Sequence, residues 1–176
     1  MNQRIYSRAE GLIRKYGTRD PFELMEAMHV NVLFSQAYSD KGLKGYCTVM
    51  NRIKYVVINA KLPPDELAIV GSHECGHLAL HADKLRIGAL SDFDIYNARG
   101  KMEREANIFA ADYLISDEEV ADLISCQGSD FFSVASALRV PAPFFAFKLY
   151  SMVERGFALR LPVEPDSAFM RIKHAR

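Results

Sequence analysis

The chain has 176 residues, of which 22 are lysine or arginine and 22 are aspartate or glutamate, so its formal net charge is zero. This balance argues against a protein that coats nucleic acid or an anionic membrane, because both tasks need a surplus of basic residues. Apolar types make up 49% of the residues and charged types 25%, which is typical of a globular domain and not of a disordered chain. The length fits one domain with a small appendage.

The sequence also indicates where the protein acts. Its N-terminus has scattered charges and no apolar stretch of the kind found in secretion signals. The longest nearly unbroken apolar run, residues 140–147, is far shorter than the roughly 20 residues that cross a bilayer. Cys47, Cys75 and Cys126 are widely spaced, which suits reduced thiols better than a disulfide framework. We therefore expect a cytoplasmic protein without a membrane partner.

The first third of the chain predicts two helices and a small sheet. Apolar residues recur at helical spacing through residues 1–16, and Gly17 ends the pattern. A short helix is expected at 21–28, with Asp20 as its N-cap and Glu23 as the capping-box partner. Runs rich in β-branched and aromatic residues then predict one strand followed by a hairpin, at 30–34, 45–50 and 53–59.

The remainder predicts mainly helices. Helices are expected at 66–81 and 101–115, with a long loop at 83–99 between them, and Ser116 and Glu119 form a capping box for the next helix. Two further helices, separated by a turn at 139–141, resemble a helix-turn-helix pair. We expect a core at 1–127, a helical extension packed on it at 128–160, and a tail at 161–176.

Two of the five histidines fall in the run His73-Glu74-Cys75-Gly76-His77, an H-E-x-x-H pattern inside a predicted helix. Four residues turn a helix by about 400°, so His73 and His77 project from one face and can offer two ring nitrogens to one metal ion. Glu74 is offset by about 100° and can act on a water without being a ligand. This division suits metal-assisted amide hydrolysis, in which zinc lowers the pKa of a water to about 7 and a carboxylate takes the proton.

A catalytic zinc site needs three protein ligands and one open position, and the helix predicted from residue 101 offers the third ligand. Glu103 lies one turn before Asn107, so both can face the site if this helix packs beside the first, whereas Glu105 points about 200° away. We predict Glu103 as the ligand and Asn107 as the residue that orients His73 or His77 through its other ring nitrogen. One Zn²⁺ per chain is the expected cofactor, and manganese or iron can use the same ligand types.

H-E-x-G-H followed at this distance by Glu-x-x-Ala-Asn-x-Phe-Ala resembles the ImmA/IrrE family of metallopeptidases. The resemblance extends over most of the chain and includes the segments 44–46, 57–59, 78–81, 111–115 and 138–141. It implies a compact zinc-peptidase fold of gluzincin type. It also implies a partner, because members cut a helix-turn-helix repressor and so relieve repression in phages, mobile elements or stress responses. Related zincins often carry aspartate where this chain has Asn107.

Residues next to the motif have plainer interpretations. His81 continues the i, i+4 series, but a third histidine would compete with Glu103 for the ion, so we expect it at the helix end or behind the ligands. Cys75 lies about 200° round the helix from His73 and is expected to be a small buried residue. Three tyrosines are candidates for stabilising the oxyanion, with plain packing as the alternative for each: Tyr46, Tyr96 and Tyr113.

The predicted hairpin directly precedes the metal helix, so one of its strands is expected at the rim of the cleft. Residues 53–59 are the more uniformly apolar strand and are expected in the interior of the sheet. An extended substrate segment is then expected to pair with the edge strand. That strand supplies Gly45, Tyr46, Cys47, Thr48 and Val49.

The sequence thus predicts an α+β zinc-dependent endopeptidase in which a small mixed sheet packs on the H-E-x-x-H helix. Its expected substrate is a protein, a helix-turn-helix repressor, and direct contact with nucleic acid is not expected. Two alternatives are a non-catalytic regulator that keeps the metal as structure and binds a repressor, and a DNA-binding regulator. Glu74 favours catalysis because a structural site has no use for a base, and zero net charge counts against DNA binding.

Overall fold

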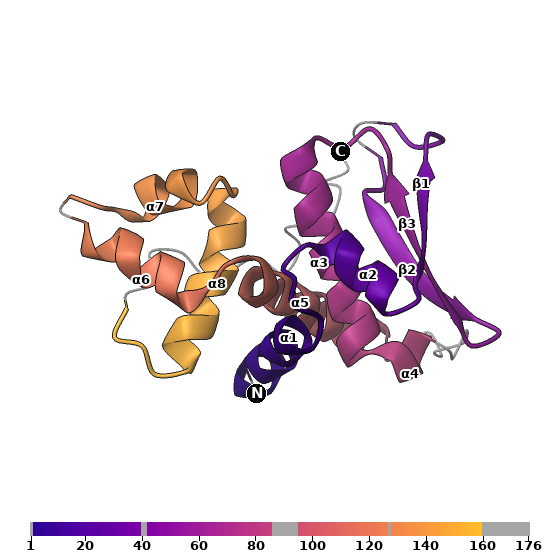
Figure 1. The fold of residues 1–176 in the computed structure, drawn as a ribbon, viewed down its shortest axis with the longest axis horizontal. Coiled ribbons are helices and arrows are strands. Elements are labelled where there is room, and N and C mark those ends of the chain that lie inside the picture. Colours follow the sequence, from indigo (N-terminus) through magenta and orange to yellow (C-terminus); the bar gives the residue numbers. More distant parts are fainter. Residues whose placement is uncertain (1, 40–41, 86–94, 127, 160–176) are drawn as a thin grey trace.

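The computed structural model describes residues 2–39, 42–85, 95–126 and 128–159, with side chains left undescribed at 95–99. The predicted tail at 161–176 lies outside these ranges. The elements, in chain order, are α1 (Asn2–Tyr16), α2 (Pro21–Ala27), β1 (Asn31–Ser35), β2 (Gly45–Met50), β3 (Ile53–Asn59), α3 (Pro64–Leu80), α4 (Ala82–Leu85), α5 (Ile95–Leu114), α6 (Asp117–Ser125), α7 (Phe131–Ala137) and α8 (Ala142–Glu154) (Figure 1).

The sheet has three strands in the order β1-β3-β2. The central strand β3 pairs in parallel with β1 and antiparallel with β2. The α+β class with a small mixed sheet is therefore confirmed, and so is the placement of 53–59 inside the sheet with 45–50 at its edge. Among the described residues, no strand pairs with the outer side of β2.

The hairpin turn fixes which backbone groups of β2 stay free. Asn51 and Arg52 form a two-residue turn with φ values of 50° and 67°, which is the conformation of a type I′ hairpin. Hydrogen-bonded pairs then alternate away from the turn, in agreement with the Asn59 N–H that donates to the Lys44 carbonyl at 2.8 Å. The N–H and C=O groups of residues 45, 47 and 49 therefore point to the outer edge of the sheet.

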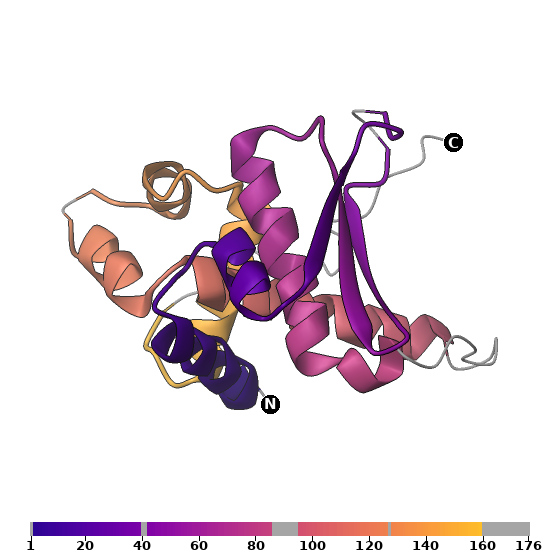
Figure 2. The same ribbon diagram turned by 45° about the vertical axis from the view of Figure 1, so that its right-hand side comes forward.

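Helix α3 lies at the centre of the molecule. It contacts β2 and β3 on one side and α2 and α5 elsewhere on its surface (Figures 1 and 2). Every residue from Ile69 to Leu78 is buried, including the whole H-E-x-x-H run. Because this middle part of the helix is buried all round, little water reaches it, and its polar side chains need partners from neighbouring elements.

Helices α3 and α5 approach each other closely at Gly76. A Cβ atom built on Gly76 would lie 3.1 Å from both the Cα and the carbonyl oxygen of Ala106 in α5. The missing side chain lets the two backbones come together, and this contact brings the first half of α5 beside the histidines of α3. The glycine of H-E-x-G-H is therefore a packing requirement.

The C-terminal helices join the same interior. One cluster of buried apolar residues runs from Ile5 in α1 to Met152 in α8, so the boundary near residue 127 stays a prediction. The Lys148 ammonium in α8 is fully buried and lies 3.2 Å from Asp112 and 2.7 Å from Asp117. Within the described ranges, every helix is too short or too polar to span a bilayer.

Two local expectations are wrong. Residues 83–99 are not a continuous loop, because α4 occupies Ala82–Leu85 and α5 begins at Ile95; residues 86–94 lie outside the described ranges. The Asp20 carboxylate caps α2, but the reciprocal half of the box does not form. Glu23 instead accepts a hydrogen bond from the Thr18 hydroxyl, whose oxygen accepts the Asp20 N–H.

The substitution Gly76→Ala tests the close contact. The added methyl group meets backbone atoms of a packed helix that cannot move aside as a side chain would, so we expect a loss of about 1–3 kcal/mol of stability in urea unfolding. Gly11→Ala in α1 is the matched control. A Cβ there meets nothing within 4 Å, and the change should stabilise the helix by up to about 1 kcal/mol. Equal stability of the two variants would show that α3 and α5 do not need this glycine.

Candidate metal centre

Three side chains from α3 and α5 bring their donor atoms together. The Nε2 atoms of His73 and His77 lie 3.0 Å apart, and each lies 3.4 Å from a carboxylate oxygen of Glu103. These are the residues that the described part of the chain offers as a metal cluster. The two histidines come from consecutive turns of α3, and the carboxylate comes from α5 across the Gly76 contact.

The spacing of these donors fits a zinc ion. Nitrogen and oxygen ligands that hold zinc at about 2.0–2.1 Å in a tetrahedron lie about 3.3–3.4 Å from one another. The nitrogens lie 3.0 Å apart, and each lies 3.4 Å from a different oxygen of the Glu103 carboxylate, Oε2 for His73 and Oε1 for His77, so the carboxylate faces both imidazoles at about this spacing. Two imidazoles and one carboxylate make three protein ligands, which leaves the fourth position for water or substrate.

Asn107 holds the first histidine. Its Oδ1 lies 2.8 Å from Nδ1 of His73 and accepts a hydrogen bond from it, which leaves the lone pair of His73 on Nε2, the atom that faces the cluster. Among the described residues, Asn107 Nδ2 has no hydrogen-bond partner. The structure therefore places Asn107 against His73 and not against His77.

His81 and Glu105 stand behind the second histidine. Nδ1 of His77 lies 3.2 Å from Nδ1 of His81, and Nε2 of His81 lies 2.9 Å from the Glu105 carboxylate. His81 is the C-cap residue of α3, so it lies both at the helix end and behind a ligand. Glu105 does point away from the metal cluster, but sequence reasoning missed its contact with His81. The sequence did contain one signal for this contact, because His81 follows His77 by four residues and therefore lies on the same side of the helix.

The charges of the cluster perturb one another. Burial raises the pKa of Glu103, but hydrogen bonds from His73 and His77 outweigh it, so this pKa lies well below its usual range. Burial lowers the pKa of His73, yet the hydrogen bond to Glu103 and the charge of Glu74 raise it above its usual value. Burial is also the main cause of the lowered pKa of His81. Glu103 is thus ionised at neutral pH, as a ligand must be.

Glu74 lies outside the three-donor cluster but beside it. It is only 4% exposed, and its charge contributes to the raised pKa of His73. Burial, followed by the charge and hydrogen bonding of Glu74, raises the pKa of the Cys47 thiol in β2. Glu74 therefore lies between a histidine of the cluster and the edge strand.

The predicted substrate strand presents two different faces. A Cβ on Gly45 would meet a methyl group of Val70, so residues 45, 47 and 49 face α3 and their neighbours point away. Tyr46 is accordingly 41% exposed on the opposite face. The structure thus brings Cys47 near Glu74 through its side chain. Of the five residues predicted to bind substrate, Gly45, Cys47 and Val49 have free backbone groups at the outer edge, whereas those of Tyr46 and Thr48 belong to the ladder with β3.

The structure describes the side chains of two of the three candidate tyrosines. Tyr113 follows the packing alternative, because its side chain is buried and its hydroxyl donates to the carbonyl oxygens of Thr18 and Asp20. Tyr46 faces away from α3, and the side chain of Tyr96 lies outside the described part. Cys75 is buried as expected, with its thiol directed at the carbonyl of Pro21.

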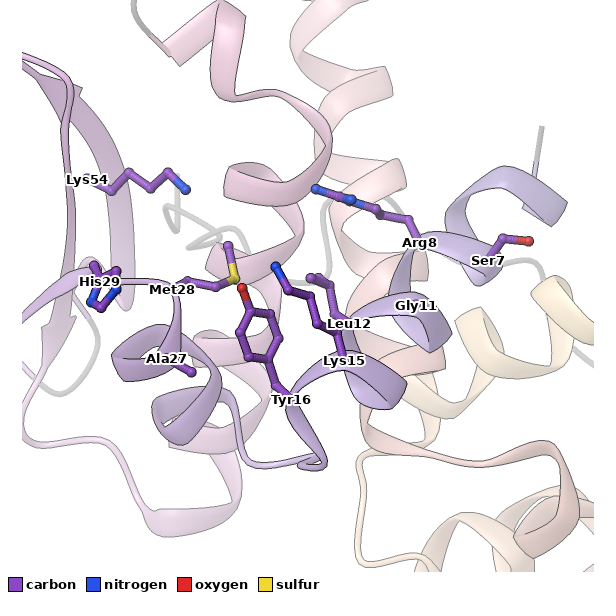
Figure 3. Close-up of a pocket in the computed structure, with 10 residues that line it drawn as sticks. All are labelled: Ser7, Arg8, Gly11, Leu12, Lys15, Tyr16, Ala27, Met28, His29 and Lys54. Atoms are coloured by element: carbon purple, nitrogen blue, oxygen red, sulfur yellow. The ribbon is translucent and has the colours of Figure 1, made fainter.

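A cavity of about 440 Å³ lies between α1, the end of α2 and the start of β3. Arg8, Lys15 and Lys54 extend towards the space between α1 and the sheet (Figure 3). The lining contains no residue of the metal cluster.

Comparisons with known proteins agree with this geometry. The Peptidase M78 family model, described as the IrrE N-terminal-like domain, matches residues 25–150, a range that contains the metal cluster. The chain is also 33% identical over 113 residues to "Uncharacterized immunity region protein 2" of Bacillus phage phi105, an alignment that covers 64% of this chain and 69% of the phage protein. The chain therefore belongs to the IrrE N-terminal-like family of metallopeptidases, as its resemblance to ImmA/IrrE proteins predicted.

Proposed function

We propose that the protein is a zinc-dependent endopeptidase that holds one Zn²⁺ per chain through His73, His77 and Glu103. The observation that carries the proposal is the set of two buried imidazole nitrogens that face one half-buried carboxylate, Glu103, with a second and buried carboxylate, Glu74, beside them. A purely structural metal site would have no use for that second carboxylate.

Glu74 and Asn107 have different roles in the proposed hydrolysis of the peptide bond. Bound zinc supplies polarisation of the scissile carbonyl and a lowered pKa for the attacking water. Glu74 takes one proton from that water as its oxygen bonds to the carbonyl carbon, and gives the proton to the amine as the C–N bond breaks. Asn107 keeps His73 in the tautomer that presents Nε2.

The proposed substrate is a helix-turn-helix repressor, cut in the cytoplasm to relieve repression. Support comes from the family match and from the phage relative, whose name places it in an immunity region. The described free thiols suit a reducing compartment. Direct DNA binding is disfavoured because Phe144, Phe145 and Phe147 of α8 are buried in the core and do not face outwards.

The edge strand β2 is the proposed docking line for the substrate. The N–H and C=O groups of residues 45, 47 and 49 point outwards, and the side chain of Cys47 lies next to Glu74. An extended segment paired along this edge would pass the general base. The repressor must therefore expose a linker or loosen a helix before it is cut.

The substitution Glu74→Gln tests catalysis. Glutamine keeps the shape of the side chain but does not accept the proton, so cleavage should fall by about 10²–10⁴-fold or more while zinc content stays at the parental level. The assay is cleavage of a purified helix-turn-helix repressor that the parental protein cuts. Glu66→Gln, on the same helix but paired with Lys44, is the control and should keep full activity. Parental cleavage by Glu74→Gln would remove Glu74 from the mechanism.

The substitution Val49→Pro tests strand pairing. The register leaves the N–H of Val49 free at the outer edge, whereas the N–H of Thr48 belongs to the ladder with β3, so only position 49 separates docking from folding. Loss of one hydrogen bond of about 0.5–1.5 kcal/mol should raise KM about 2–10-fold with zinc retained. Val49→Ala keeps the N–H and is the control. An unchanged KM for the proline variant would exclude pairing at this residue.

A further inference from the structure

We propose that His81 and Glu105 form a hydrogen-bond relay that fixes His77 in the tautomer able to bind metal. The inference rests on the proposed metal site and adds two positioning residues to it. Neither residue is one of the three donors; Glu105 acts on His81, and His81 contacts His77 on the side away from the cluster.

The relay is continuous and buried. It runs from Nδ1 of His77 to Nδ1 of His81 over 3.2 Å, and from Nε2 of His81 to the Glu105 carboxylate over 2.9 Å. The side chains of His81 and Glu105 are 3% and 7% exposed, so water does not compete for these bonds. The backbone N–H of His81 donates to the carbonyl of His77 at 2.8 Å, which fixes the position of the relay histidine relative to the ligand.

The direction of the hydrogen bonds follows from the donor and acceptor rules of each group. An ionised carboxylate only accepts, so Nε2 of His81 must carry a proton and donate it to Glu105. A neutral His81 then has a lone pair on Nδ1 and accepts a hydrogen bond from Nδ1 of His77. His77 is thereby left with its lone pair on Nε2, which is the atom 3.4 Å from Glu103 in the cluster.

The opposite arrangement would disable the site. If His81 donated from Nδ1, then Nδ1 of His77 would have to accept, and the proton of a neutral His77 would move to Nε2. That nitrogen would have no lone pair for a metal ion. The buried Glu105 carboxylate therefore selects the binding tautomer of a residue that it does not touch.

With the relay, three polar residues of α5 each support the metal cluster. Asn107 holds His73 directly, and Glu105 holds His77 through His81, while Glu103 itself is the third donor. The three residues alternate along one stretch of the helix, and each acts on a different part of the cluster. Loss of such supporting hydrogen bonds typically lowers metal affinity about 10–100-fold.

The first test uses the unmodified chain. In the zinc-loaded protein, long-range ¹H–¹⁵N NMR spectra of the imidazoles should show His77 protonated on Nδ1 and His81 protonated on Nε2. Zinc binding with the proton of His81 on Nδ1 would overturn the relay alone. Failure of the parental protein to bind zinc would overturn the proposed function and the relay together.

The second test is a double-mutant cycle read by zinc affinity in a chelator competition. His81→Ala and Glu105→Leu should each lower the affinity about 10–100-fold. His81→Asn should stay near the parental value, because its amide oxygen replaces Nδ1 as acceptor, as Asn107 does for His73. Once His81→Asn has cut the link, Glu105→Leu should have no further effect on affinity.

The same chelator competition includes a control variant outside the relay. Glu118→Gln removes an exposed carboxylate in the first turn of α6 and should leave zinc affinity unchanged. An equal loss from Glu105→Leu in the parental and His81→Asn backgrounds would show that Glu105 acts independently of His81. Parental affinity in His81→Ala would show that His77 needs no partner behind it.

Discussion

The structure depends on one constraint, the burial of the middle of α3, from Ile69 to Leu78, among the sheet and the neighbouring helices. This burial places His73, Glu74 and His77 where little solvent reaches their polar atoms. Leaving such groups unpaired costs about 1–3 kcal/mol each, and more for a charge. Helix α5 avoids this cost because it presents polar side chains on the surface that packs against α3. The side chains that form the candidate site therefore also supply the polar partners that the buried part of α3 needs in the core.

The close approach at Gly76 connects packing to chemistry. Because a Cβ at this position would meet the backbone of Ala106, the glycine sets how near α5 lies and therefore whether Glu103 reaches both imidazoles. The sheet completes the arrangement on the other side of α3, where the edge strand β2 carries Cys47 beside Glu74. The metal cluster, the proposed general base and the proposed docking edge all lie on or against α3.

Patterns local to one helix could be predicted from the sequence, and so could the approach of Glu103 and Asn107 to the histidines, because helical spacing and the chemistry of the site required it. Other contacts between elements could not. The period of 3.6 residues was enough to place His73 and His77 on one face and Glu103 and Asn107 on another, and alternation identified β3 as the inner strand. The partners of Glu105 and Tyr113 depend on how α5 crosses its neighbours, which no spacing encodes. The sequence therefore left Tyr113 with two interpretations, oxyanion helper or packing residue, and its hydroxyl donates to carbonyls of the turn before α2. The start of α5 at Ile95 was predicted as loop because the sequence there is polar and contains a glycine, which is typical of loops.

The central claim is that two histidines and one carboxylate form a metal site, and zinc titration calorimetry tests it most directly. The account predicts one zinc per parental chain and a large loss of affinity in Glu103→Gln, because the amide replaces an anionic ligand by a neutral one. The unfolding transition of the metal-free variant should remain cooperative, which would separate loss of a ligand from loss of the fold. Zinc binding by Glu103→Gln with the parental affinity and stoichiometry would contradict the account.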